Sequence, residues 1–98
     1  MSVLLSLEVA NMRQLRNYME EAVEQYIEQW LPQADVCQCE DCRLDIMAIM
    51  LNALPPQYGV TDTGAMFAKL REFSFQHRAD IMAAMISAIE KVKGKPSH

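Results

Sequence analysis

The sequence predicts an all-α fold, a small bundle of about four to five helices with a cysteine-rich, metal-binding loop. Apolar residues recur at spacings of three and four along most of the chain, which is the period of an amphipathic helix. Proline and glycine residues fall where helices would end, and no segment shows the alternation of a half-buried strand. At 98 residues we expect a single domain, 1–98, with 1–16 as a possible N-terminal extension and 94–98 as a disordered tail.

The first helix is indicated by one apolar stripe. Its members are Met12, Leu15, Met19, Ala22, Val23, Tyr26, Ile27 and Trp30. Pro32 should end the helix at about residue 30 or 31. Its start is open, because Asn17 before Glu20 and Asn11 before Gln14 both resemble capping boxes. Either the helix runs from about residue 7, or a short N-terminal helix precedes one that begins near Asn17.

The second helix follows a loop over residues 33–40 and is predicted from Cys42 to Ala53, with Asp41 as N-cap. It is apolar nearly all round, which is typical of a central helix or of one buried in a subunit interface. Pro55 and Pro56 should stop it and force an extended turn through residues 57–59.

Two further helices are predicted in the C-terminal third. The third is capped by a residue between 61 and 63 and continues through Leu70, with Phe73 as a further member of its apolar face. We place a break at about residues 73–76, although no glycine or proline marks it. The last helix carries an apolar face and ends near Lys93, with Gly94 and Pro96 at the usual stop positions.

Composition and charge limit the class of protein. The helices are apolar over more of their surface than one small domain can bury, so we expect a homodimer. A formal net charge of −4 without a basic stripe argues against duplex nucleic acid as a ligand. There is no signal-peptide pattern, and no apolar run reaches the length of a membrane span, so we expect a cytoplasmic protein without a membrane partner.

The three cysteines of the chain, Cys37, Cys39 and Cys42, lie within six residues. In a cytoplasmic protein such a cluster more often indicates metal or redox chemistry than disulfides. Clustered thiolates suit zinc, which prefers four ligands in a tetrahedron, so the sequence predicts a structural zinc site. His77 is the first choice for a fourth ligand. The alternatives are His98, Asp35, Glu40, a water molecule or the partner subunit.

Redox chemistry is the competing interpretation, because residues 39–42 form a Cys-x-x-Cys motif. That motif normally lies in a βαβ setting, which the pattern lacks, and we expect the two intervening acidic residues to raise the pKa of the thiols. The sequence also lacks a glycine-rich phosphate loop, a nucleophile elbow and paired histidines. We therefore expect that the protein is not an enzyme and has no catalytic residues.

The runs Cys37–Ile46 and Leu51–Tyr58 resemble the ComFB family of late-competence proteins, and Asn17–Glu21 and Arg78–Ile81 fit its first and last helices. The resemblance covers about residues 15–95. It implies a small, helical, dimeric bacterial protein with no known enzymatic activity, which binds zinc through the cysteine cluster. Some relatives are receptors for cyclic dinucleotides, chiefly cyclic di-GMP, and link that signal to competence, motility or cell size. This sequence departs from the family pattern in lacking a fourth cysteine.

A cyclic dinucleotide, either cyclic di-GMP or cyclic di-AMP, has two phosphates and two bases, and its symmetry suits the two-fold axis of a dimer. We predict that Arg71 and Arg78 supply the positive charge of a nucleotide-binding site. Asn52 and Tyr58 are expected to lie near the base. The alternative for each arginine is a helix-surface ion pair. The alternative function is a zinc-stabilised protein–protein interaction module of the competence pathway, with a protein effector and no nucleotide ligand.

Overall fold

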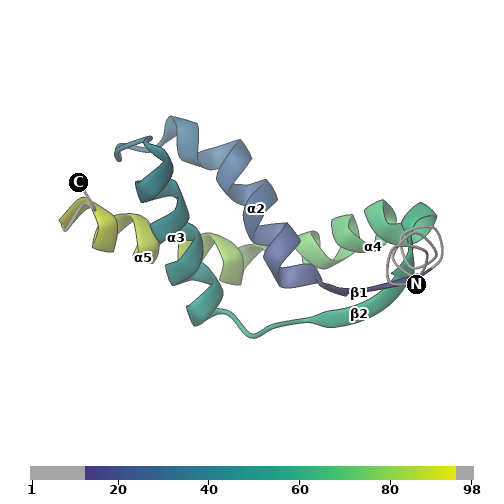
Figure 1. Ribbon diagram of the computed structural model, residues 1–98. Helices are drawn as coiled ribbons and strands as arrows, with labels where there is room; N and C mark the ends of the chain where they lie inside the picture. The colour runs from purple at the N-terminus through teal and green to yellow at the C-terminus, as the bar shows by residue number, and fades with distance from the viewer. Residues whose placement is uncertain (1–12, 95–98) are drawn as a thin grey trace, which may run out of the picture.

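The computed structural model describes residues 13–94, which contain four α-helices, a 3₁₀ turn and a two-stranded ribbon (Figure 1). The elements in chain order are β1 Arg13–Asn17, α2 Tyr18–Trp30, η1 Leu31–Gln33, α3 Glu40–Ala53, β2 Tyr58–Asp62, α4 Thr63–Gln76 and α5 Arg78–Gly94. The all-α class is confirmed, since the two short strands are a minor part of the described chain. Most of the proposed N-terminal extension and the tail beyond residue 94 lie outside the described residues.

The ribbon is the main departure from the predicted elements. Residues 13–17, expected to be helical in one interpretation, form β1 and pair antiparallel with β2, so that Leu15 lies opposite Val60. Leu15 was assigned to the buried stripe of the first helix, but its side chain is 69% exposed. The expected helix start near Asn17 is confirmed, because α2 begins at Tyr18. The short helix expected before it falls largely on residues 1–12, outside the described residues.

Asn17 explains both the helix start and the pairing. Its Oδ1 accepts a hydrogen bond from the N–H of Met19 at 3.2 Å, which caps α2. The same oxygen accepts from the N–H of Gln57 at 2.9 Å, and the N–H of Tyr18 donates to the Gln57 carbonyl at 2.7 Å. The extended turn after the two prolines is therefore held against the start of α2 and continues as β2. This contact joins residues 40 positions apart, so the local pattern could not indicate it.

The core is formed mainly by α2, α3 and α5, with α4 continuing the line of α5 towards the ribbon (Figure 1). Its largest fully buried side chains are Met19, Val23, Ile27, Leu31, Cys42, Ile46, Met50, Ile81 and Met85. The predicted break before the last helix falls at His77, one residue beyond the expected range. The N–H of His77 still donates to Phe73, and that of Ile81 to His77, so the chain bends there with its hydrogen bonds continuing.

The start of α3 also differs from the predicted one. We expected Cys42 as the first residue with Asp41 as the cap, but α3 begins at Glu40 and Cys39 is the N-cap. The buried face of α3 contains Cys42, Ile46 and Met50, whereas its apolar Leu44 is exposed. The end of α5 at Gly94 agrees with the predicted stop. None of the helices in the described part of the chain combines the length and apolarity that crossing a bilayer requires.

Candidate metal centre and ligand cavity

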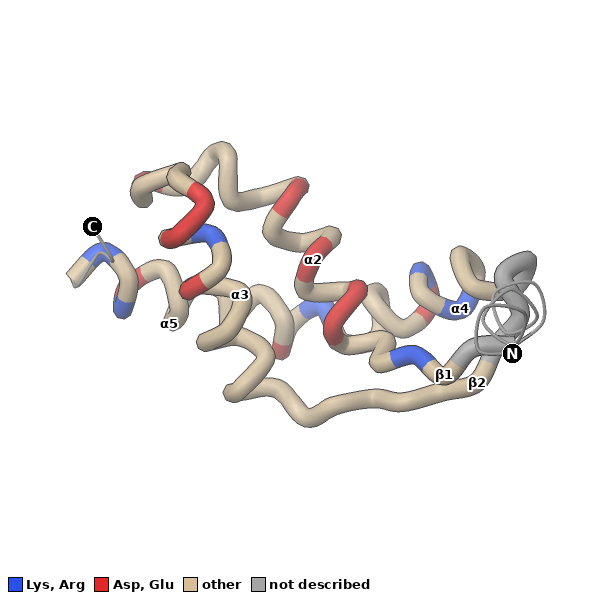
Figure 2. Tube along the Cα trace, in the orientation of Figure 1, with Lys and Arg blue, Asp and Glu red and all other residues tan. Residues whose placement is uncertain are grey.

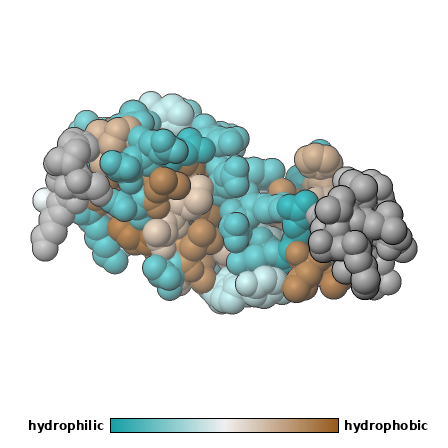
Figure 3. Space-filling view, viewed as in Figure 1, coloured by the Kyte–Doolittle hydropathy of each residue, from teal (hydrophilic) through white to brown (hydrophobic). Residues whose placement is uncertain are grey.

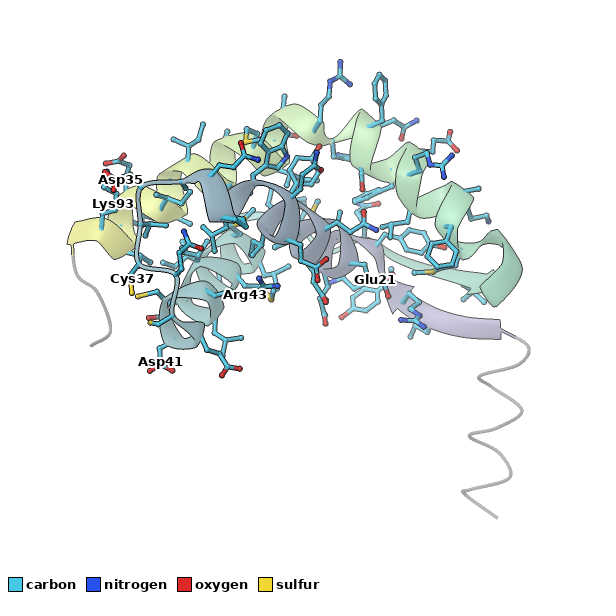
Figure 4. The ribbon with its side chains drawn as sticks, turned by 90° about the horizontal axis from the view of Figure 1, so that it is seen from above. Glu21, Asp35, Cys37, Asp41, Arg43 and Lys93 are labelled. Atoms are coloured by element: carbon cyan, nitrogen blue, oxygen red, sulfur yellow. The ribbon has the colours of Figure 1, made fainter. Side chains whose placement is uncertain are left out.

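The three cysteines come together where the loop after η1 enters α3. Figure 4 shows Cys37 at this end of the molecule. Their Sγ atoms all lie within 4.8 Å of one another. The side-chain amide of Gln38 donates to the carbonyl of Leu31 at 2.8 Å and approaches that of Val36 at 3.2 Å. This amide ties the loop back onto η1, so the sulfurs are held close by a local hydrogen-bond network.

The cysteines differ in exposure and in electrostatic setting. Cys42 is buried, Cys37 is half-buried and Cys39 is exposed. The N–H of Cys42 donates to Cys39 Sγ at 3.4 Å. This hydrogen bond is the main reason that the pKa of Cys39 is lowered, with further contributions from the side chains of Cys37 and Cys42 and from the N–H of Asp41. The expectation that the acidic neighbours would raise the pKa is therefore wrong for Cys39, because the N–H groups at the start of α3 favour the thiolate.

This donor set fits a soft or borderline metal ion. A tetrahedral ion with metal–sulfur bonds of about 2.3 Å would bring its sulfurs to about 3.8 Å from one another, so closure around an ion needs only a small movement. Among the described residues, the group that could hold a metal contains the three cysteines and no histidine or carboxylate. His77 lies instead at the junction of α4 and α5, where its ring packs on Phe73 with centroids 4.3 Å apart. The fold does not bring His77 to the cysteines of its own chain.

A cavity of about 660 Å³ lies between α2, α4 and α5. It is lined by Gln25, Tyr26, Gln29, Trp30, Phe67, Arg71, Ser74, Phe75, Arg78, Ala79 and Met82. Two of the four predicted nucleotide-binding residues, Arg71 and Arg78, therefore share one cavity. Asn52, near the end of α3, and Tyr58, at the start of β2, are exposed and do not line it.

Arg78 is held in the cavity wall by a backbone carbonyl and an aromatic ring. Arg78 donates to the carbonyl of Phe75 at 2.6 Å, and its guanidinium lies over the Phe75 ring at 4.1 Å from the centroid. Within the described part of the chain, neither Arg71 nor Arg78 takes part in an ion pair. The positive charge of the cavity is therefore not neutralised, and Figure 2 shows the acidic residues mainly along α2 and at the start of α3.

The aromatic part of the cavity was not predicted from the sequence. Trp30 and Tyr26 were assigned to the apolar stripe of the first helix, but both line the cavity, together with Phe67 of α4. Phe67 is 71% exposed. Ser74 also contributes, and its Oγ is buried without a hydrogen-bond partner among the described residues. Sequence spacing gave no signal for this convergence, because it depends on how α4 packs against α2.

The fold and the cysteine cluster define a small helical protein with a candidate metal centre and a separate cavity. The chain belongs to the ComFB family: the family model described as late competence development protein ComFB matches residues 16–96. The fold is similar to that of a solved structure of the late competence protein ComFB from Bacillus subtilis, with a TM-score of 0.70 and 23% sequence identity. That match covers 86% of this chain and 93% of the other. A comparison with curated proteins found no match.

Proposed function

We propose that the protein is a non-enzymatic, cytoplasmic bacterial regulatory protein of the ComFB type that binds a cyclic dinucleotide. In this role it would regulate competence, motility or a related process. The observation that carries the proposal is the convergence of Arg71 and Arg78 with aromatic side chains in one cavity. The volume of about 660 Å³ lies within the usual range for small-ligand sites.

The chemistry of the cavity matches the parts of this ligand. Guanidinium groups bind phosphate oxygens through paired hydrogen bonds, and no carboxylate among the described residues pairs with Arg71 or Arg78. Bases stack on aromatic rings and on guanidinium planes, and Trp30 and Phe67 supply such rings in the wall of the cavity. The side-chain amides of Gln25 and Gln29 add neutral donors and acceptors for a base edge.

The proposal includes a structural zinc ion held by Cys37, Cys39 and Cys42. The three thiolates are the preferred donors for zinc, and the ion would fix the loop and the start of α3. The cysteine cluster and the cavity share no residue, so the zinc ion would stabilise the fold and would not touch the ligand.

A homodimer is the third part of the proposal. Large apolar side chains remain exposed on several elements, among them Leu15, Val60, Phe67, Phe75 and Ile86. Figure 3 shows apolar areas over α3 and beside the ribbon. Exposed apolar area of this kind marks interaction surfaces, and a two-fold axis would match the symmetry of a cyclic dinucleotide.

Titration calorimetry with cyclic di-GMP and cyclic di-AMP tests the ligand. We expect heat from at least one of them, and a loss of about 1.5–3 kcal/mol in binding on changing Arg71→Ala or Arg78→Ala. Arg43→Ala is the matched control, because Arg43 lies on α3, outside the cavity, and faces Glu28 at 3.8 Å. Absence of heat from both nucleotides would overturn the receptor proposal, as would an equal loss in the Arg43→Ala variant.

A second candidate function is the zinc-stabilised interaction module with a protein effector. Tryptophan, tyrosine and arginine are the residues most enriched in protein–protein hot spots. The presence of Trp30, Tyr26 and Arg71 in the cavity wall therefore supports this second function. The calorimetry separates the two functions, since a module of this kind gives no heat with either nucleotide.

A further inference from the structure

Two side chains in the cavity wall, Arg78 and Phe75, are already stacked on each other. The guanidinium of Arg78 lies over the ring of Phe75, with its Cζ atom 4.1 Å from the ring centroid. Its Nη1 also donates to the carbonyl of Phe75 at 2.6 Å. Both side chains line the cavity, and Phe75 is 66% exposed. The fold therefore holds a planar cation in one orientation before any ligand binds, which lowers the entropy cost of binding on it.

Arg71, the other arginine of the cavity, has a different setting. It makes no hydrogen bond or ion pair with any described residue. Arg78, in contrast, has one amino group engaged and one face of its guanidinium covered. Arg71 precedes Arg78 by seven residues (78 − 71), about two helical turns, and backbone hydrogen bonds continue across the junction of α4 and α5. The two arginines can therefore contact different parts of one ligand.

We infer that a base of the bound nucleotide stacks on the guanidinium of Arg78, with Phe75 on the opposite face, and that Arg71 is the arginine that binds phosphate. The inference rests on the nucleotide-binding part of the proposed function and divides the two arginines between two tasks. A guanidinium is flat, delocalised and weakly hydrated, so its open face accepts a base as an aromatic ring does. Phosphate is bound instead at the edge of a guanidinium, through paired N–H donors, and Arg71 keeps these available.

The hydrogen bond from Arg78 to the Phe75 carbonyl also stabilises the end of α4, because cationic side chains complement the last carbonyls of a helix. Lysine at position 78 keeps the charge and can still donate to this carbonyl, but it has no planar face. Lysine at position 71 keeps a charge that binds phosphate as a point charge. Arg78→Lys and Arg71→Lys are therefore a matched pair, in which the first removes the stacking surface and the second only weakens the phosphate contact.

The test is titration calorimetry of the full chain with cyclic di-GMP and cyclic di-AMP. We expect Arg78→Lys to weaken binding by about 5-fold to 150-fold, the range for one stacked base. Arg71→Lys should weaken it by less than about fivefold, since lysine remains a phosphate ligand. Arg43→Lys, outside the cavity, is the control and should bind as the wild type does.

Phe75→Leu tests the other half of the stacked pair, because it keeps an apolar side chain and removes the ring. It should weaken binding as Arg78→Lys does. In the double variant Phe75→Leu/Arg78→Lys the combined loss should be smaller than the sum of the two single losses, because the two side chains act as one unit. Additive losses would show that Phe75 does not support the stacking surface and would overturn this part of the inference.

The proton resonances of the arginine Nε–H groups give a direct second readout. On saturation with nucleotide, the Arg78 proton should move upfield, because it would lie over the face of the base. The Arg71 proton should move downfield on hydrogen bonding to phosphate. Equal losses of affinity in the two lysine variants, a greater loss in Arg71→Lys, or a downfield shift at Arg78 would overturn the inference while leaving the receptor proposal intact. A wild-type chain that binds neither nucleotide would overturn both.

Discussion

The cysteine cluster and the arginine-lined cavity are assembled in different ways. The cluster comes from one short run, residues 37–42, and is held by the Gln38 amide and by the backbone at the start of α3. The cavity takes its walls from three helices, with lining residues from Gln25 on α2 to Met82 on α5. The cluster is therefore a local structure, whereas the cavity exists only when distant helices pack together.

This difference has an energetic consequence. The cluster brings thiols close together at a helix start that favours thiolates, so a metal ion is expected to stabilise it strongly. The cavity is kept open by the core beneath it, to which the partly buried Tyr26 contributes from the cavity wall. Changes to the core, Cys42 included, should therefore affect both regions, whereas changes at the exposed Cys39 should affect only the cluster.

The largest effect is expected from Ile46→Ala. Ile46 is 0% exposed and lies one turn after Cys42 on the buried face of α3, so its truncation should lower the free energy of unfolding by about 2–5 kcal/mol. Urea unfolding is followed by the fluorescence of Trp30, the single tryptophan, which lines the cavity, and by thiol labelling at the cluster. Both probes should shift together, because both regions rest on one core.

Ile86→Ala is the control for that experiment. Ile86 is 57% exposed on α5, so at protein concentrations low enough to keep the chain monomeric the change should cost about 0.5 kcal/mol or less. A transition in thiol labelling at a lower urea concentration than the transition in fluorescence would contradict this prediction. The two regions would then be independent folding units.

A smaller effect is expected from Gly59→Ala in β2. A Cβ atom at this position would lie 2.9 Å from Cε2 of Tyr18, whose ring covers the glycine. The resulting overpacking should lower the free energy of unfolding by about 1–3 kcal/mol. Zinc affinity should be unchanged, because the ribbon contributes nothing to the cluster.

Gly94→Ala is the control, since a Cβ there would meet nothing within 4 Å, and it should change stability by less than about 1 kcal/mol. Equal losses in the two variants would contradict the steric explanation.

The next effect separates the two roles of Cys39, which is both a candidate metal ligand and the N-cap of α3. In metal-free protein, Cys39→Ser keeps a side-chain acceptor for the N–H of Cys42, whereas Cys39→Ala does not. The serine variant should therefore be the more stable by about 1 kcal/mol in chelator-treated samples. Both variants should bind zinc more weakly than the wild type. Equal stability of the two variants would show that a side-chain acceptor at position 39 does not stabilise the start of α3.

The smallest effect concerns the reactivity of the cysteines. In metal-free protein we expect iodoacetamide to modify Cys39 first and Cys42 last, because Cys39 is exposed and Cys42 is buried. The lowered pKa of Cys39 acts in the same direction, since a larger fraction of its thiol is ionised at any pH below the usual thiol pKa. Mass spectrometry of timed samples gives the order. Earlier modification of Cys42 than of Cys39 would contradict this prediction and would mean that the cysteine loop opens enough to expose Cys42.

Several features could be predicted from the sequence because they depend on residues close together in the chain. The helical period, the stop at Pro55 and Pro56 and the end of α5 at Gly94 are of this kind. So is the cysteine cluster, whose spacing also supports the family assignment that the comparison confirms. The cap by Cys39 was missed, because cysteine is not among the usual N-cap residues.

The sequence by itself thus determined the helical class, the candidate metal centre and the family. Only the tertiary structure decided that residues 13–17 pair with 58–62, that Arg71 and Arg78 meet Trp30 in one cavity, and that His77 lies away from the cysteines. The physical reason is the separation along the chain over which each kind of interaction acts. Hydrophobic period, caps and ligand spacing act over a few residues, whereas strand pairing and helix packing join segments that are about 40 or more positions apart and leave no local signal.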